Sequence, residues 1–524
     1  MKKSSIIYML CGASLLVTPA CTDLDETIYG TVDADNFGRT EAEIEAIMGP
    51  VYRTFSQYHT HTTFGSLDCA GDMPIVPTRV GGDWYDAGQF RELHQHTWTA
   101  STNALDKCWN IATKAIASCN LVYSTVEGRE LDAEIKKRTL AEIRGIRAFW
   151  IYVMIDNFGN FPLVTSYGET ELPEVTPRKE AYDFLIKELT EIKEQLISEV
   201  SGTTYGKFTK GSALAILAKS YLNAEAWGVD SPRWQEVIDA CDEAMTLGYM
   251  LEPDYKTNFQ INNEISREAM LVAVYSVNDP EIKDYPETRN QLFLWTLHYN
   301  ARKALGIRAE GHNGLSAQPD YVKLFDEADS RLEGSFLLGE MRDPDTKEIL
   351  LTAHDRPLIH TKDITILTDD NNYDPATGWG AVHQEDGARC WKWPIDKSVT
   401  TAAENDIHIF RYADIYLMKA EALVRLGRNA EATSLVNTIR ERGFGNSDHN
   451  YTTVTLDEIM LERKLEFAWE NFSRQDCIRF GTFFDARFVK KANHGEEYRK
   501  IFAIPLNAWQ ANPKLKQNTG YPPF

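Results

Sequence analysis

Apolar residues repeat with the period of an α-helix over two regions of the chain, and this pattern constrains the fold most. Apolar or small residues recur at positions i, i+3, i+4 and i+7 within each segment. The periodic segments are 133–155, 212–226, 234–247, 411–426, 429–440 and 456–470. Helices with one apolar face must bury that face against a neighbour, so we expect a mostly α-helical protein.

The spacing of small residues within the helix pairs indicates how they pack. In the later pair, two residues separate the helices, and Ala420 and Ala432 fall twelve positions apart. The two helices of a tetratricopeptide repeat pack closely at this spacing. Ala218 and Ala240 form a wider version in the earlier pair. We therefore expect tetratricopeptide-like helix pairs as a frame.

Two other regions, about 60–100 and 280–405, are rich in glycine and proline and have no long periodic run. They predict loops and short strands inserted beside a helical frame of about 100–280 and 405–480. Since loops on a rigid scaffold often carry the binding residues, we expect the functional site in these two regions. The whole of 21–524 is predicted to form one domain.

The first twenty residues have the organisation of an export signal. Two lysines precede an apolar run over 6–17, which is shorter than the roughly 20 residues of a membrane-spanning helix. Small residues then lead to Cys21, as a lipoprotein signal peptidase requires. We expect residues 1–20 to be removed and the mature chain to be anchored by a lipid on Cys21. Thr18 stands where the common lipobox has leucine, and plain secretion is the alternative.

Composition narrows the class of protein further. The 524-residue chain is 43% hydrophobic and 25% charged, as in globular proteins with a large core. Its formal net charge of −22 would repel phosphate backbones, so we expect no nucleic-acid partner. Beyond the N-terminal run, no apolar stretch approaches a transmembrane length. Membrane contact is therefore expected through the lipid alone.

The cysteines of the mature chain are too sparse for a disulfide scaffold. Buried free thiols are the preferred interpretation, although Cys108 and Cys119 are near enough in sequence to pair across a helix turn. Besides Cys21, the mature chain contains Cys69, Cys108, Cys119, Cys241, Cys390 and Cys477.

An ordered series of short motifs covers nearly the whole chain. They are RAFW at 147–150, NFGNFPL at 157–163, KGSA at 210–213, AKSYL at 218–222, RYAD at 411–414, LMKAEA at 417–422, VNTIR at 436–440, ERKLEF at 462–467, RQDCIR at 474–479 and QNTGY at 517–521. In this order they resemble the SusD/RagB family of outer-membrane lipoproteins that bind nutrient glycans. Most of these residues are structural, and Glu462, Arg463 and Glu466 are spaced to form ion pairs along one helix.

This resemblance implies a SusD-like fold and a protein that captures a poly- or oligosaccharide without chemistry or cofactor. It also implies delivery of the glycan to a TonB-dependent SusC-like outer-membrane transporter. The acidic cluster of Asp23, Asp25 and Glu26 in residues 22–26, directly behind Cys21, resembles the signal that sends Bacteroidetes lipoproteins to the cell surface. The expected location is the outer membrane, facing the exterior.

A glycan site needs aromatic rings that stack on the apolar faces of sugars and polar groups that bond their hydroxyls. The loop from Asp72 to Tyr85 offers this mixture, with Arg79, Asp83 and Trp84 between them. The family similarly places glycan contacts on loops of this region. We predict that Trp84 stacks on a sugar while the charged residues bond its hydroxyls.

Further aromatic candidates lie in the second loop-rich region. Trp295 and Tyr299 are four positions apart, so one helical face could carry both, or they could lie on a strand. Trp295 is expected to join Trp84 in one platform: a flat one would suit an extended β-glycan, and a curved one a helical α-glucan. Trp379, between two glycines, is a third candidate. Core packing is the better interpretation for Trp98, Trp391 and Trp393.

Two possible metal sites are weaker than their structural alternatives. His59, His61, His94 and His96 form two His-x-His pairs, for which solvent-facing strand histidines are the preferred account. The acidic patch at 369–374 lacks the spacing of a calcium loop, so a solvated loop is expected. We predict no metal.

No familiar catalytic motif occurs, which favours a binding protein over an enzyme. Two alternatives stay open. A surface glycoside hydrolase needs only two carboxylates brought together by folding, and the chain has 77 acidic residues. A protein-docking scaffold without glycan affinity would use the helical frame alone.

Overall fold

The computed structural model describes residues 40–61, 67–276, 290–368, 380–398 and 403–524, and helices dominate them. The frame helices are α1 (Glu41–His61), α3 (Asn103–Glu127), α4 (Ala133–Asn157), α5 (Arg178–Ile192), α6 (Lys210–Asn223), α7 (Trp234–Met245), α12 (Tyr412–Arg425), α13 (Asn429–Phe444), α14 (Leu456–Phe467) and α15 (Ser473–Arg479). The prediction of a mostly α-helical fold is confirmed. Every periodic segment of the sequence forms a helix within a few residues of the expected bounds.

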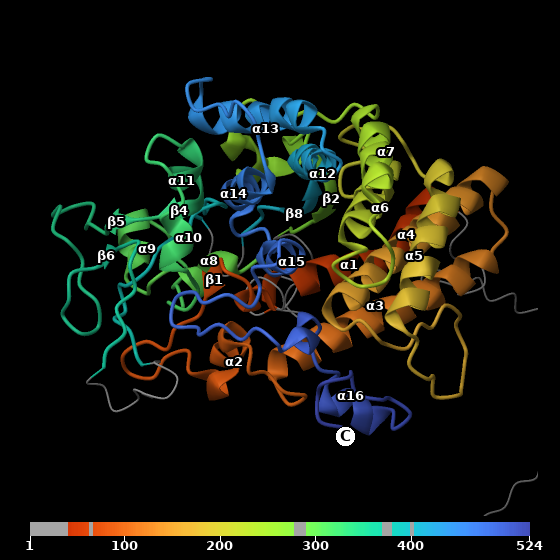
Figure 1. Ribbon diagram of the computed structural model, residues 1–524, viewed down its shortest axis with the longest axis horizontal. Coiled ribbons are helices and arrows are strands. Elements are labelled where there is room, and N and C mark those ends of the chain that lie inside the picture. The colour runs from red at the N-terminus through yellow and green to blue at the C-terminus, as the bar shows by residue number, and fades with distance from the viewer. Residues whose placement is uncertain (1–39, 62–66, 277–289, 369–379, 399–402) are drawn as a thin grey trace, which may run out of the picture.

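The helix pairs pack as their small residues predict. α3 to α7 stand side by side at the right of Figure 1, and α12 packs against both α7 and α13. Ala420 and Ala432 are fully buried at the α12/α13 contact, and Ala218 and Ala240 are buried between α6 and α7. Small side chains permit this close approach of helix backbones.

Polar residues before the helices explain where several of them begin. The Asp132 carboxylate accepts hydrogen bonds from the backbone N–H groups of Glu134 and Ile135 at the start of α4. Thr209 and Thr455 form capping boxes at the starts of α6 and α14. Each cap satisfies donors that a helix N-terminus leaves unpaired, which fixes the helix start.

Short strands join segments that are distant in sequence. Among the described residues there are four two-stranded antiparallel sheets. They pair β1 (Pro74–Ile75) with β3 (Ser316–Ala317), β2 (Ala269–Ala273) with β8 (Ile407–Arg411), β4 (Phe336–Leu337) with β7 (Arg389–Cys390) and β5 (Gly339–Glu340) with β6 (Ile359–His360). The β1–β3 pair connects the two loop-rich regions. The expected loops and short strands are thus present.

Short helices are an addition to what the sequence predicted for the loop-rich regions. They are α2 (Gln89–Gln95), α8 (Leu292–Thr296), α9 (Ala301–Leu305), α10 (Pro319–Val322) and α11 (Ser330–Ser335), with α16 (Leu506–Ala511) near the C-terminus. Helices of one or two turns show no apolar repeat long enough to detect. α8 to α11 lie opposite the α3–α7 side of the frame in Figure 1.

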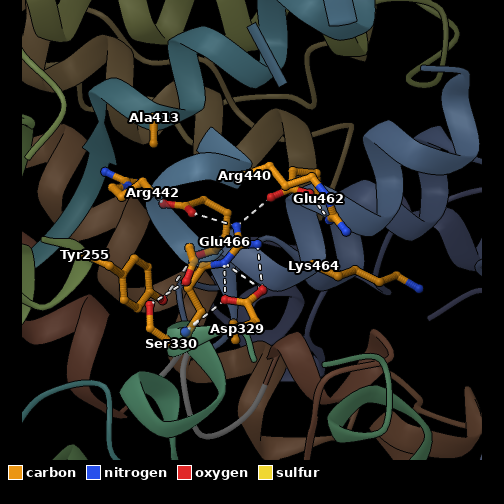
Figure 2. A network of polar contacts seen from close by, with 12 residues as sticks. Tyr255, Asp329, Ser330, Ala413, Arg440, Arg442, Glu462, Lys464 and Glu466 are labelled. Atoms are coloured by element: carbon orange, nitrogen blue, oxygen red, sulfur yellow. Dashed lines mark hydrogen bonds and ion pairs between the residues drawn. The ribbon is translucent and has the colours of Figure 1, made fainter. Parts of the chain in front are cut away.

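A buried ion-pair network joins residues 280–405, called the insert here, to the frame (Figure 2). Arg331 on α11 donates to Glu462 and Glu466 on α14 at 2.6 and 3.2 Å. Glu466 also contacts Arg411, at 2.6 Å, and Arg442. The side chains of Arg331, Glu462 and Glu466 have no exposed area. The charges compensate one another, which makes their burial tolerable.

The prediction that Glu462, Arg463 and Glu466 form ion pairs with one another along one helix is wrong, because their partners lie on other elements. Arg463 donates to Asp414 on α12 and to Asp476 on α15, each at 2.8 Å. α14 is surrounded by other elements, so each of its buried charges meets an opposite charge on a neighbouring element.

The described part of the chain tests the predictions about the cysteines and about membrane-spanning helices. Cys69, Cys108, Cys119, Cys241, Cys390 and Cys477 are buried free thiols, as preferred above. Cys108 and Cys119 both lie on the single helix α3, so no turn brings them together. Among the described residues, no helix is both long enough and apolar enough to cross a bilayer. Cys21 and the export signal lie outside those residues.

Candidate functional site

An open depression of about 570 Å³ lies where the two loop-rich regions meet. Its lining residues are Asp83, Trp84, Asp86, Tyr299, Glu310, Gly311 and His312. The first three come from the loop after β1 and the rest from the segments that follow α8. The lining therefore combines two aromatic side chains with several polar groups.

Several non-glycine residues around this depression have positive φ angles, a conformation that strains the backbone. Trp84, Asp86 and Ala87 have positive φ angles of 63°, 43° and 53°, and Asn313 has a φ of 58°. Four of the ten non-glycine residues with positive φ in the described chain thus gather here. Such conformations cost free energy and concentrate at ligand-binding sites, which supports a functional reading.

Trp84 is held by contacts on several sides. Its indole N–H donates to the carbonyl oxygen of His312 at 2.5 Å. The ring centroid lies 5.5 Å from that of Trp295 with 60° between the planes, and 5.9 Å from that of Phe90. The ring is half-buried, so part of it remains available to a ligand. The steep angle means that Trp84 and Trp295 do not form a flat platform.

Two glycines allow the chain to come this close. A Cβ atom on Gly314 would lie 2.3 Å from the Trp84 ring, and one on Gly311 would lie 2.1 Å from the carbonyl oxygen of Leu297. The backbone N–H groups of Gly314 and Leu315 both donate to the carbonyl oxygen of Trp295 at 2.8 Å. The segment after α9 is thereby folded back onto α8 beneath the Trp84 ring.

Tyr299 and Asp83 connect the two sides of the depression. The Tyr299 hydroxyl donates to the Asp83 carboxylate. Burial, followed by this hydrogen bond, raises the pKa of Tyr299 to about 12, so the phenol stays protonated at neutral pH. Tyr299 lies beyond the end of α8, so neither the single helical face nor the strand expected for Trp295 and Tyr299 is found.

Arg79 lies beneath the depression. Its side chain is fully buried and donates to the carbonyl oxygens of Asn313, Gly314, His383 and Asp386 and to the Ser316 hydroxyl. Burial lowers its pKa to about 10, which still leaves the guanidinium charged. Because these bonds reach two distant chain segments, 313–316 and 383–386, Arg79 holds the floor of the depression together and offers no exposed donor to a ligand.

Asp72 belongs to a different part of the molecule. Its carboxylate forms an ion pair with Lys464 at 2.6 Å and accepts from the Ser473 hydroxyl at 2.8 Å. The Lys464 charge holds the pKa of Asp72 below its ordinary value despite burial. These contacts fasten the start of β1 to α14 and α15, so the structure does not bring Asp72 to the depression.

The structure brings together only some of the residues that the sequence predicted for the site. Trp84, Asp83, Tyr299 and Trp295 come together, and Tyr85, which follows Trp84 in the chain, has 52% of its surface exposed. Arg79 lies below them and Asp72 lies elsewhere. Trp379 falls outside the described residues.

The sequence reasoning missed several lining residues. They are Asp86, Glu310, Gly311 and His312. The Gly-His-Asn-Gly run at 311–314 was a usable signal, because two glycines in four residues indicate a close approach of the backbone.

Two of the three tryptophans predicted to lie in the core do so. Trp98 and Trp393 are 1% and 6% exposed, and the Trp98 indole donates to the Tyr521 hydroxyl at 2.6 Å. Trp391 is only half-buried, so the core interpretation is wrong for this residue.

The expectation of solvent-facing strand histidines is wrong. His94 lies in α2 and His96 directly follows it, and both are almost fully buried, as is His59 in α1. Their imidazoles face the carbonyl oxygens of Phe488, Ala70 and Phe55. Burial lowers the pKa of His94 to about 3, so it is neutral. The His61 side chain lies outside the described part.

No cluster of metal-ligating side chains occurs among the residues that the structure describes. The acidic patch at 369–374 lies outside them. The expectation that it forms a solvated loop therefore stays a prediction.

A model of the SusD family matches residues 247–521, which is more than half of the chain. The chain belongs to the SusD family. The match includes Trp295, Tyr299 and Glu310, whereas the loop that carries Trp84 precedes it.

Relatives span almost the same length. The starch-binding protein SusD of Bacteroides thetaiotaomicron is 25% identical over 84% of this chain and 82% of its own. The SusD-like protein P25 of Formosa agariphila is 24% identical over 95% of this chain and 96% of its own.

Solved structures confirm the SusD-like fold. A laminarin-binding SusD-like protein superposes with a TM-score of 0.72 at 20% identity, covering 92% of this chain and all of its own. Surface glycan-binding protein A from Bacteroides fluxus gives a TM-score of 0.71 at 19% identity over 92% of this chain and all of its own.

Proposed function

We propose that this protein binds a poly- or oligosaccharide in the depression beside Trp84. The observation that carries the proposal is the pairing of a half-buried tryptophan with Tyr299 and Asp83 across an open concave surface. An aromatic ring that is held in place and partly exposed suits the apolar face of a sugar. The names of the starch-, laminarin- and glycan-binding relatives agree with this ligand class.

Each residue has a role in this proposal. Trp84 stacks on a sugar ring, and Asp83 and Tyr299 bond hydroxyl groups. Trp295 supports the Trp84 ring from the side, because it contacts that ring but does not line the depression. Tyr85 extends the contact surface at the rim.

The inclined arrangement of Trp84 and Trp295 leaves Trp84 as the tryptophan that faces the depression. In this proposal the expected two-tryptophan platform is therefore replaced by a single stacking ring. The choice between an extended β-glycan and a helical α-glucan passes to the binding experiment.

The proposed role is capture without catalysis. The chain would hold the glycan at the cell surface, anchored through a lipid on Cys21, and pass it to a SusC-like TonB-dependent transporter. Family membership and the N-terminal sequence support this placement. Protein docking would use the helical frame, whose helices α3 to α7 lie on the side opposite α8 to α11 (Figure 1).

Two experiments, carried out one after the other, test the proposed site. A glycan array identifies the ligand, and titration calorimetry then compares wild type with Trp84→Ala. We expect binding to weaken by about thirtyfold or more, because truncating an aromatic anchor costs about 2 kcal/mol or more and each 1.4 kcal/mol is tenfold. Trp509→Ala is the matched control, since Trp509 is a half-buried tryptophan on α16.

Two outcomes would refute the proposal. Unchanged affinity in Trp84→Ala, with an unchanged circular dichroism spectrum, would remove Trp84 from the site. Release of reducing ends from the bound glycan would instead identify a glycoside hydrolase, for which the carboxylates lining the depression are the first candidates.

A further inference from the structure

The depression has an uneven distribution of charge that bears on ligand choice. Its lining contains the carboxylates of Asp83, Asp86 and Glu310 and no lysine or arginine. Burial lowers the pKa of His312, the remaining titratable group besides Tyr299, so this imidazole is neutral at neutral pH. A ligand in contact with the lining therefore meets negative charge only.

The buried arginines near the depression do not give its lining a positive charge that a ligand could reach. Arg79 is fully buried, and its donors are bonded to backbone carbonyls and to Ser316. Arg389, also fully buried, donates to Ser316 and to the carbonyl oxygen of Gln384. An anion in the depression would have to be desolvated without reaching either guanidinium.

Two further arginines, the exposed Arg302 and the half-buried Arg91, are engaged by other groups. Arg302 forms an ion pair with Glu310 at 3.1 Å, with both side chains about half exposed. The Arg91 guanidinium lies over the Tyr85 ring at 5.7 Å. Arg302 thus offsets the charge of Glu310 from outside the lining, while the carboxylates of Asp83 and Asp86 keep the surface that contacts a ligand acidic.

We propose that the carboxylates of Asp83, Asp86 and Glu310 make this site selective for uncharged glycans over glycans that carry carboxylate or sulfate groups. The inference rests on the proposed glycan-binding function and names the substrate class within it. Hydroxyl groups are good donors to carboxylates, so an uncharged sugar satisfies the lining. An anionic substituent brings a like charge into contact with it.

The test uses matched pairs of probes. Soluble starch, laminarin and the neutral glycans of an array are each compared with a C6-carboxylated and a sulfated form of the same backbone. We expect at least about tenfold tighter binding of the neutral member at low ionic strength. The ratio should shrink as added salt screens the repulsion.

A charge-removing variant assigns the selectivity to the lining. Asp86→Asn combined with Glu310→Gln removes two of the negative charges and also releases Arg302 from its ion pair. We expect the neutral-to-anionic affinity ratio to fall at least about threefold in this variant. Asp239→Asn with Glu225→Gln, both exposed on the frame, makes the same change in net charge and should leave the ratio as in wild type.

The possible results distinguish a failure of the proposed charge selectivity from a failure of the proposed glycan binding. Equal or tighter binding of the anionic forms overturns the selectivity and leaves glycan binding intact. A ratio that falls equally in both double variants also overturns it, because the net charge of the whole protein would then be responsible. An absence of binding to every probe overturns the proposed function and the inference together.

Discussion

Trp84 shows how a loop residue acquires a fixed orientation. Its φ of 63° is unusual for an aromatic residue, and the His312 carbonyl and the Trp295 ring hold the indole in that conformation. Gly314 completes the arrangement because any side chain there would overlap the indole. The orientation of the proposed stacking surface thus depends on a residue without a side chain.

This dependence predicts that Gly314→Ala impairs binding without touching the ligand. The new methyl group would lie 2.3 Å from the indole and must displace it. We expect affinity for the glycan to fall about tenfold or more in titration calorimetry. Gly202→Ala is the matched control, since a Cβ there meets open space.

A double variant separates displacement of Trp84 from general damage. If Gly314→Ala acts through Trp84, adding it to Trp84→Ala should cause little further loss, because contacting residues are not additive. Full additivity of the two losses would contradict this account.

Single residues also mark the limit of prediction from sequence. Trp84, Asp83 and Tyr299 were predictable as candidates because aromatic and acidic residues in Gly-rich loops match the chemistry of sugars. The structural role of Arg79 was not predictable. Its partners are mainly backbone carbonyls from segments more than 200 positions away, and carbonyls leave no trace in the residue types.

At the scale of elements, Glu466 links four parts of the fold. It lies on α14 and contacts Arg331 of α11, Arg411 at the end of β8 and Arg442 of α13. Removing its charge would leave three buried guanidinium groups with fewer partners. The loss of one partner of a buried pair typically costs about 3–5 kcal/mol.

We therefore expect Glu466→Gln to lower the free energy of unfolding by about 3–5 kcal/mol in urea titrations. Glu431→Gln is the control, because its pair with Arg428 is exposed and such pairs contribute about 0–1 kcal/mol. Equal stability of the two variants would contradict the proposed role of the network.

The pH dependence gives a second check on Glu466. The surrounding arginines hold its pKa well below the ordinary value despite burial. A carboxyl with a lowered folded-state pKa contributes stability above its unfolded-state pKa, and this contribution is lost as pH falls. The stability gap between wild type and Glu466→Gln should accordingly narrow below about pH 4.

Elements were predictable where the signal is local. Six of the frame helices follow from apolar repeats and small residues, which is why α4, α7 and α12 match their expected segments closely. No periodic segment was predicted for α1, α3 or α5. α1 contains Pro50, a residue that argues against a helix interior. Strands of two residues such as β1 and β3 have no periodicity to detect, so only the tertiary fold defines them.

At the scale of the whole molecule, the proposed glycan site and the helices proposed for protein docking belong to different parts of the fold. The depression is built from the loop-rich regions, while the α3–α7 side of the frame lies opposite the insert (Figure 1). A glycan and a protein partner could therefore bind at the same time.

The last prediction concerns location and partner together. If Cys21 is lipidated and faces outward, protease treatment of intact cells should digest the protein, and Cys21→Ser should release it from the membrane fraction. Pull-down of the wild-type protein from outer membranes in mild detergent should recover a β-barrel transporter. Trp84→Ala should recover it equally well, because Trp84 lies in the glycan site and not on the frame. Full protection from protease would overturn the surface location, and recovery of this protein alone would argue against a transporter partner.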